Sequence, residues 1–145
     1  MKTLKTLIRV HEWHLEEKRR ILVELETKRE SILARLAKLE AEIAAEKAFV
    51  AQQVDDQYRM SALDFSYYHE DAKEKRADIQ LELKFNGEAI AAAQIEVTAA
   101  YQELKKYETA LEQRVKREAL IASQKEQIRL DDMAIEGFRR RKVGG

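Results

Sequence analysis

The sequence predicts an all-α protein: two long helices in an antiparallel coiled-coil hairpin, the second helix longer, with a C-terminal overhang. Three observations predict this class. Apolar residues recur every seventh position along most of the chain, as they do where one helix packs along another. The 145 residues include no proline. Charged residues make up 37% of the chain, which is typical of long exposed helices rather than of a thick globular core.

The first helix is expected over about residues 3–57. With Ile8 at heptad position a, six of the seven a sites are apolar: Ile8, Leu15, Leu22, Arg29, Leu36, Ile43 and Val50. Four of the seven d sites are apolar: Leu4, His11, Lys18, Leu25, Ile32, Leu39 and Glu46. These positions predict a continuous seam, meaning the apolar stripe shared by two packed helices, which charged residues interrupt at Lys18, Arg29 and Glu46.

A turn is expected over about residues 58–65, because the heptad pattern fails between Asp55 and Tyr68. Asp64 and Ser66 are suitable N-caps for a following helix. The aromatic residues near this turn are Phe49, Tyr58, Phe65, Tyr67 and Tyr68. Two interpretations stay open for them: they plug the end of the hairpin, or they bind a protein partner, since aromatic side chains are enriched where proteins meet.

The second helix is expected over about residues 66–140, followed by a frayed tail at 141–145. Its apolar a sites are Leu83, Ile90, Val97, Leu104 and Leu111. Its d sites are Ile79, Asn86, Ala93, Ala100, Tyr107, Arg114, Ile121, Ile128 and Ile135. Asn86-Gly87 is a turn signal inside this helix and would give a third helix if the chain reversed there. We favour a tolerated glycine, because the heptad phase continues from Leu83 to Ile90.

The two helices differ in length, and this difference predicts an unpaired segment. At about 1.5 Å per residue they are about 80 Å and about 110 Å long. If the chain folds back near residue 61, Ile8 lies beside about residue 114, and everything after about Ala119 extends past the N-terminus. There the a sites are charged, whereas the d sites remain isoleucine. A narrow apolar stripe without a partner in the hairpin predicts a partner in another molecule.

No catalytic residue, metal ligand set or cofactor site is expected, and we do not expect an enzyme. His11 and His14 are three residues apart, whereas the helical zinc-protease motif needs histidines four apart. Carboxylates on such a helix are expected to be solvated and paired with lysines along it. The basic run Arg139–Lys142 is interpreted as complementing the helix dipole. Contact with an acidic protein surface, lipid head groups or nucleic acid is the alternative.

The remaining composition limits partners and location. Lys plus Arg equals Asp plus Glu, 27 each, so no long-range field would draw the chain to nucleic acid. Cysteine is absent, which fits a reducing compartment. No stretch approaches the roughly 20 apolar residues of a transmembrane helix. We therefore expect a single cytoplasmic domain over residues 1–145.

Several short charged stretches, in their order and spacing, resemble a known family. They are Glu-Glu-Lys-Arg-Arg at 16–20, Glu-Leu-Lys-Lys-Tyr-Glu at 103–108 and Leu-Asp-Asp-Met-Ala at 130–134, with Tyr67-Tyr68 after the turn. Together with the hairpin and its overhang, they resemble the flagellar FliJ family, the central-stalk proteins of the type III flagellar export apparatus. The resemblance covers nearly the whole chain.

This resemblance implies a monomeric hairpin similar to the stalk of the rotary ATP synthase γ subunit. Such a stalk inserts into the hexameric export ATPase ring, links it to the membrane-embedded export gate, and binds export chaperones. It would lie at the cytoplasmic face of the inner membrane, at the base of the flagellum. The two other interpretations are the equivalent stalk of a virulence type III secretion system and a generic coiled-coil scaffold.

Carried onto this chain, the resemblance implies two contact surfaces. The residues for the ATPase ring are Ile121, Ile128, Leu130, Met133, Ile135 and Phe138. The residues for the export gate are Val54, Tyr58, Phe65 and Tyr68.

Overall fold

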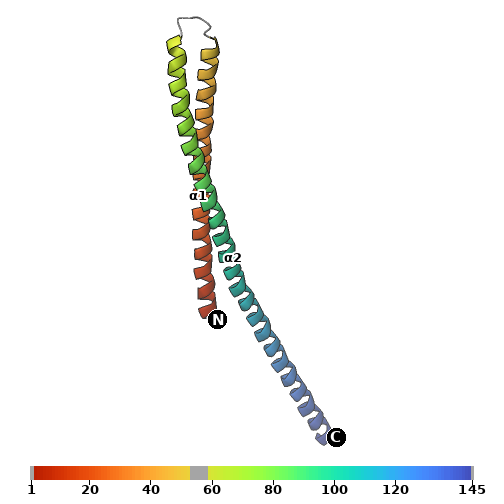
Figure 1. Cartoon of the computed structure of the whole chain (residues 1–145). Helices are drawn as coiled ribbons and strands as arrows, with labels where there is room; N and C mark the ends of the chain where they lie inside the picture. Colours follow the sequence, from red (N-terminus) through yellow and green to blue (C-terminus); the bar gives the residue numbers. More distant parts are fainter. Residues whose placement is uncertain (1, 53–58, 145) are drawn as a thin grey trace. The chain divides into compact units, whose positions relative to one another are not determined.

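The computed structural model describes residues 2–52 and 59–144, and the side chains of the second range from residue 66 onward. These residues form two helices, α1 (Lys2–Gln52) and α2 (Arg59–Gly144), which contain 51 and 86 residues (Figure 1). No strand occurs within the described ranges. The helices pack against each other, which confirms the predicted all-α class.

The chain divides into two compact units. Unit 2 is Leu15–Ala100, and unit 1 combines Met1–His14 with Tyr101–Gly145. Each unit contains a part of α1 and a part of α2.

Two predicted helix boundaries need correction. Residues 59–65 were expected in the turn but belong to α2, which begins at Arg59. This stretch contains neither glycine nor proline, so nothing in it prevents a helix. Residues 53–58, which cover the expected end of the first helix, lie outside the described residues. Residues 141–144 were expected as a frayed tail but are helical, and Arg141 and Lys142 stand in the last turn, where cations favour a helix.

Cross-helix ion pairs define the direction of packing in unit 2. They join Lys18 to Glu96 at 3.0 Å, Arg35 to Glu82, and Arg76 to Glu40 with a hydrogen bond of 2.9 Å. The partner's number falls as the α1 number rises, so the two helices are antiparallel. Because these side chains are largely exposed, each pair adds little to stability. These pairs nevertheless fix which residues of the two helices lie opposite each other.

The seam of unit 2 follows the predicted heptad. Its buried side chains are Leu15, Ile32, Leu39 and Ile43 from α1, and Ala72, Asn86, Ile90 and Ala93 from α2. All of them occupy a or d positions, with Ala72 one heptad before Ile79. The charged sites Arg29 and Glu46 are exposed. Around Ala72 large residues of α1 face a small residue of α2, because Leu39 and Ile43 pack against it.

The Asn86-Gly87 pair does not interrupt α2, which confirms the interpretation that we favoured. Asn86 is buried in the seam, and its Nδ2 donates a hydrogen bond to the backbone oxygen of Leu25 at 3.1 Å. Gly87 does not have a positive φ angle. The asparagine that indicated a turn is therefore a polar residue bonded across the seam.

In unit 1 the first turns of α1 pack on α2 around a ring stack. The rings of His11 and Tyr107 lie 4.6 Å apart at 19°, both at d positions, and Ile8 and Leu104 are buried beside them. The expected pairing of Ile8 with about residue 114 would place His11 near residue 111. That prediction is wrong by about one turn of helix, or 3.6 residues, because the register depends on where the chain reverses.

Within the described residues, no helix is long and apolar enough to cross a bilayer.

Candidate partner-binding surface

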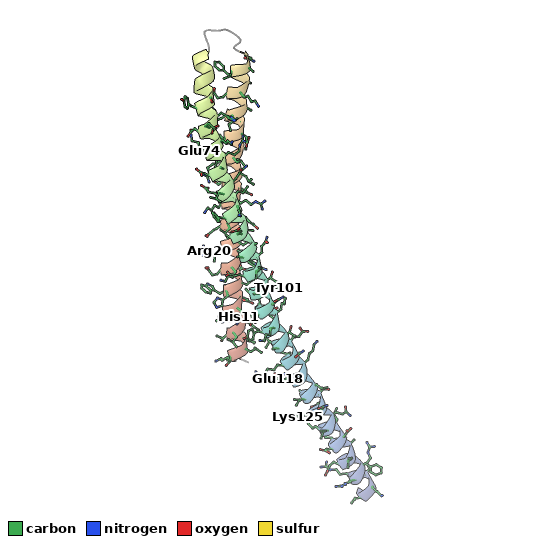
Figure 2. The ribbon with its side chains drawn as sticks, viewed as in Figure 1. His11, Arg20, Glu74, Tyr101, Glu118 and Lys125 are labelled. Carbon is green, nitrogen blue, oxygen red and sulfur yellow. The ribbon has the colours of Figure 1, made fainter. Side chains whose placement is uncertain are left out.

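The C-terminal part of α2 carries the candidate surface, within unit 1. Leu111 is half-buried and is the last apolar side chain of α2 that packs in the seam. From Glu112 to Gly144 every residue is exposed except Gly137, which is half-buried. The expected start of this unpaired segment, after about Ala119, is therefore about two turns too late. Figure 2 labels Glu118 and Lys125 on this segment, which is about 50 Å long at 1.5 Å per residue.

One face of the unpaired segment carries an apolar row. Ile121, Ile128 and Ile135 are 50%, 60% and 54% exposed. Leu120 and Phe138 lie along the edge of the same face, because 18 residues separate them and this equals five helical turns. We call these five residues the isoleucine row. Sequence reasoning missed Leu120, although its spacing from Phe138 could have identified it.

Leu130 and Met133 do not lie on the isoleucine row. At about 100° per residue, Leu130 is turned about 200° from Ile128, and Met133 is turned about 200° from Ile135. Of the six residues expected at an ATPase ring, the three isoleucines therefore lie on one face of the helix and Leu130 and Met133 on the roughly opposite face. Phe138 lies between the two faces, about 80° from both Ile128 and Leu130. Both Leu130 and Met133 are about half exposed, so neither face is covered within the described chain.

Met133 has a local polar contact that orders its side chain. Arg129 Nη1 lies 3.4 Å from Met133 Sδ, and Arg129 Nη2 forms an ion pair with Glu126 at 2.7 Å. The hydrogen bond from Arg129 lowers the pKa of the Glu126 carboxyl, and the same contact raises the pKa of the Arg129 guanidinium. Both groups therefore stay ionised near neutral pH, beside an exposed apolar side chain.

The unpaired segment is basic overall, although the whole chain is neutral. Residues 112–144 include nine basic and six acidic residues. Further ion pairs run along the helix, between Arg114 and Glu118 at 3.5 Å and between Lys116 and Glu112 at 3.1 Å. The run Arg139–Lys142 supplies the excess positive charge at the C-terminal end. The segment therefore combines exposed apolar side chains with an excess of positive charge.

The second expected surface, near the turn, is only partly described. Val54 and Tyr58 lie outside the described residues, and Phe65 lies in α2 with its side chain outside the description. Tyr68 is half-buried and packs against the cluster of Leu39, Ile43 and Ala72.

The contact of Tyr68 agrees with the interpretation that the aromatic residues plug this end of the helix pair. Two other members of that group are exposed, Phe49 at 55% and Tyr67 at 76%. Docking of a partner at Tyr68 and its neighbours therefore stays a prediction.

The histidines of α1 form ring contacts. His11 stacks on Tyr107, and His14 lies 6.0 Å from His11 and 5.4 Å from Trp13, measured between ring centroids. The described residues include no group of three or more His, Cys, Asp or Glu side chains that could hold a metal ion. His11 fills its d position, as the heptad predicts.

Comparisons of the chain with protein-family models, with curated proteins and with solved structures found no match. The fold and the surface therefore define only the class of protein. It is an antiparallel two-helix coiled coil whose second helix carries exposed apolar residues beyond the paired part of unit 1.

Proposed function

We propose that this chain is a non-enzymatic stalk of the flagellar type III protein export apparatus. Its unpaired segment would insert into the hexameric export ATPase ring. The observation that carries the proposal is the exposed apolar surface on two opposite faces of residues 112–144. A partner with one flat binding face would cover only one of them, whereas a ring surrounds the helix. The resemblance to the FliJ family in several short stretches supports the same role.

The proposal assigns a role to each end of the helix pair. The isoleucine row, with Leu130 and Met133 on the other face, would contact the ring. Val54, Tyr58, Phe65 and Tyr68 would contact the export gate, and export chaperones are further partners of such a stalk. The protein would then act at the cytoplasmic face of the inner membrane, at the base of the flagellum.

The physical basis of such a coupling is differential affinity. A stalk shifts an ATPase cycle only if it binds one conformation of the ring more tightly than another. The exposed isoleucines can supply this difference, because burial of one such side chain contributes about 1.5–3 kcal/mol. The excess positive charge of residues 112–144 would favour a ring whose inner surface is acidic or polar.

Two substitutions on opposite faces test the proposal. Ile128→Asp and Leu130→Asp should each weaken binding to a purified hexameric export ATPase by about tenfold or more, because each removes apolar contact and places a charge at the interface. Both should also reduce stimulation of ATP hydrolysis. The matched control is Val23→Asp, since Val23 is 59% exposed on α1 and lies outside the segment.

The outcomes separate the alternatives. Unchanged stimulation by Ile128→Asp would contradict the stalk proposal. If Ile128→Asp weakens binding and Leu130→Asp does not, the partner covers one face and is not a surrounding ring. A pull-down with the ATPase of a virulence secretion system in place of the flagellar one distinguishes the two kinds of export apparatus.

A further inference from the structure

A second apolar face lies on α2 in unit 2, away from the seam. It consists of Ala77, Leu81, Phe85, Ala92, Ile95 and Ala99, which we call the outer stripe. At about 100° per residue all six point within about 40° of one direction. Leu81, Phe85 and Ile95 are 50%, 57% and 71% exposed.

The outer stripe is roughly opposite the buried side of the same helix. Ile90 is 6% exposed and is turned about 180° from Leu81. A helix that packs on a single partner has one apolar stripe and a polar opposite face. Between residues 77 and 99, α2 has two apolar stripes. Glu88 is the one residue that interrupts the outer stripe. Contiguous exposed apolar surface is typical of interaction sites.

A groove between the helices of unit 2 adjoins the outer stripe at Phe85. It has a volume of about 290 Å³ and is lined by Leu25, Lys28, Glu82, Phe85, Asn86 and Ala89. Ala89 offers only a methyl group at this level. On α2 the acidic residues one heptad to either side are engaged in ion pairs, Glu82 with Arg35 and Glu96 with Lys18. The row of cross-helix ion pairs is therefore interrupted at Ala89, and the groove lies at this interruption.

Asn86 gives the groove an unused hydrogen-bond acceptor. The residue is 5% exposed, and its Oδ1 has no hydrogen-bond partner in the described part of the chain, whereas its Nδ2 is bonded to Leu25. A buried acceptor without a partner is unfavourable.

The charge around the outer stripe is negative. Residues 66–100 include seven acidic and four basic residues. Glu74, Asp78 and Glu88 stand beside or within the stripe without an ion pair in the described chain. Lys84 is the cation of α2 at the edge of the stripe, and Lys28 of α1 lines the adjoining groove. Figure 2 labels Glu74 on α2, before the stripe begins. A partner with basic residues beside its apolar ones would match this pattern.

We propose that the outer stripe and the adjoining groove bind an amphipathic helix of another protein, with lysine or arginine flanking its apolar face. The helix packs along Leu81, Phe85 and Ile95, and one of its side chains enters the groove over Ala89. A second copy of this chain does not fit as a two-fold pair, because the same acidic residues would then face each other. The inference concerns unit 2 only and does not depend on the stalk proposal.

The test uses two labelled helical peptides of about 18 residues, or five turns. Both have leucine on one face, and they differ only in carrying lysine or glutamate on the flanks. Fluorescence anisotropy in about 0.15 M salt, where exposed charges are screened beyond about 8 Å, measures their affinity for the full chain. The lysine peptide should bind at least about tenfold more tightly than the glutamate peptide.

Variants locate the binding. Phe85→Ser should lower the affinity for the lysine peptide by about tenfold, since a large apolar contact is lost. Val23→Ser is the matched control, because Val23 is 59% exposed on the other helix of the same unit. Glu88→Lys should lower the affinity for the lysine peptide and raise the affinity for the glutamate peptide. Ile128→Asp should bind both peptides as the wild type does.

Equal affinity for the two peptides, or unchanged binding by Phe85→Ser, would overturn the inference. So would sedimentation equilibrium showing a dimer that Phe85→Ser dissociates, because the stripe would then be covered by a second copy. Thermal melting of each variant by circular dichroism confirms folding, and little change is expected because all four substituted side chains are exposed.

Discussion

Ile32 is the most deeply buried side chain of unit 2, with 1% of its surface exposed. Its position d in the first helix could be predicted from the heptad alone. Leu33, the next residue, is 41% exposed. The two side chains are nearly equal in hydrophobicity, so their different exposure reflects their positions on the helix: Ile32 lies in the seam and Leu33 does not.

Ile32→Ala is expected to lower the free energy of unfolding by about 2–5 kcal/mol, the range for large-to-small changes in packed cores. Leu33→Ala should cost about 1 kcal/mol or less, because little buried surface is lost. Urea denaturation followed by circular dichroism measures both. Equal effects of the two substitutions would show that the register of α1 is wrong.

Gly87 lowers the stability of α2 without a structural benefit. Its φ angle is not positive, and a Cβ atom built there meets nothing within 4 Å. Gly87→Ala should therefore raise the free energy of unfolding by about 0.5–1 kcal/mol, the difference in helix propensity. The same measurement on Gly137→Ala, in the unpaired segment, is the control. A loss of stability in Gly87→Ala would mean that the glycine is needed for a close approach.

At the scale of elements, the two parts of α2 bury very different amounts of surface. Its side chains up to Leu111 contact α1 at regular heptad positions. From Glu112 onward no large side chain is buried. An isolated helix gains most of its stability from packing rather than from propensity, so residues 112–144 rely on their ion pairs and on the continuous helix that precedes them.

Deletion of residues 112–145 should leave the melting temperature of the paired helices within about 2 °C of the full chain, since no core contact is removed. The total helical signal in circular dichroism should fall, because 33 of the 86 residues of α2 are removed. A large drop in the melting temperature would instead indicate that the segment packs on another part of the chain.

The whole molecule has no net charge, with 27 basic and 27 acidic residues, but its surfaces do not share this balance. Residues 112–144 are basic and residues 66–100 are acidic. The two exposed apolar surfaces therefore carry opposite charge, and the partners proposed for them would differ in the same way. The separation of basic and acidic residues is visible in the sequence. Which apolar residues of each part are exposed is shown by the structure.

Sedimentation equilibrium should give a mass near 16.9 kDa, that of one chain. This expectation follows from helices that pair within a chain through cross-helix contacts such as His11–Tyr107 in unit 1. A mass of twice that value over a wide concentration range would mean that helices of two chains pair, and it would favour the scaffold interpretation. Repetition in high salt separates pairing along the seam from charge-driven association.

The sequence by itself determined the helical class and the identity of the seam residues, because heptad spacing and burial on one side of a helix are local properties. It also determined that Ile121, Ile128 and Ile135 form a row. The tertiary structure decided the register that stacks His11 on Tyr107, the end of pairing at Leu111, and the groove beside Asn86 and Ala89. Each of these depends on how two distant segments align, and a seven-residue repeat allows several alignments that differ by whole turns.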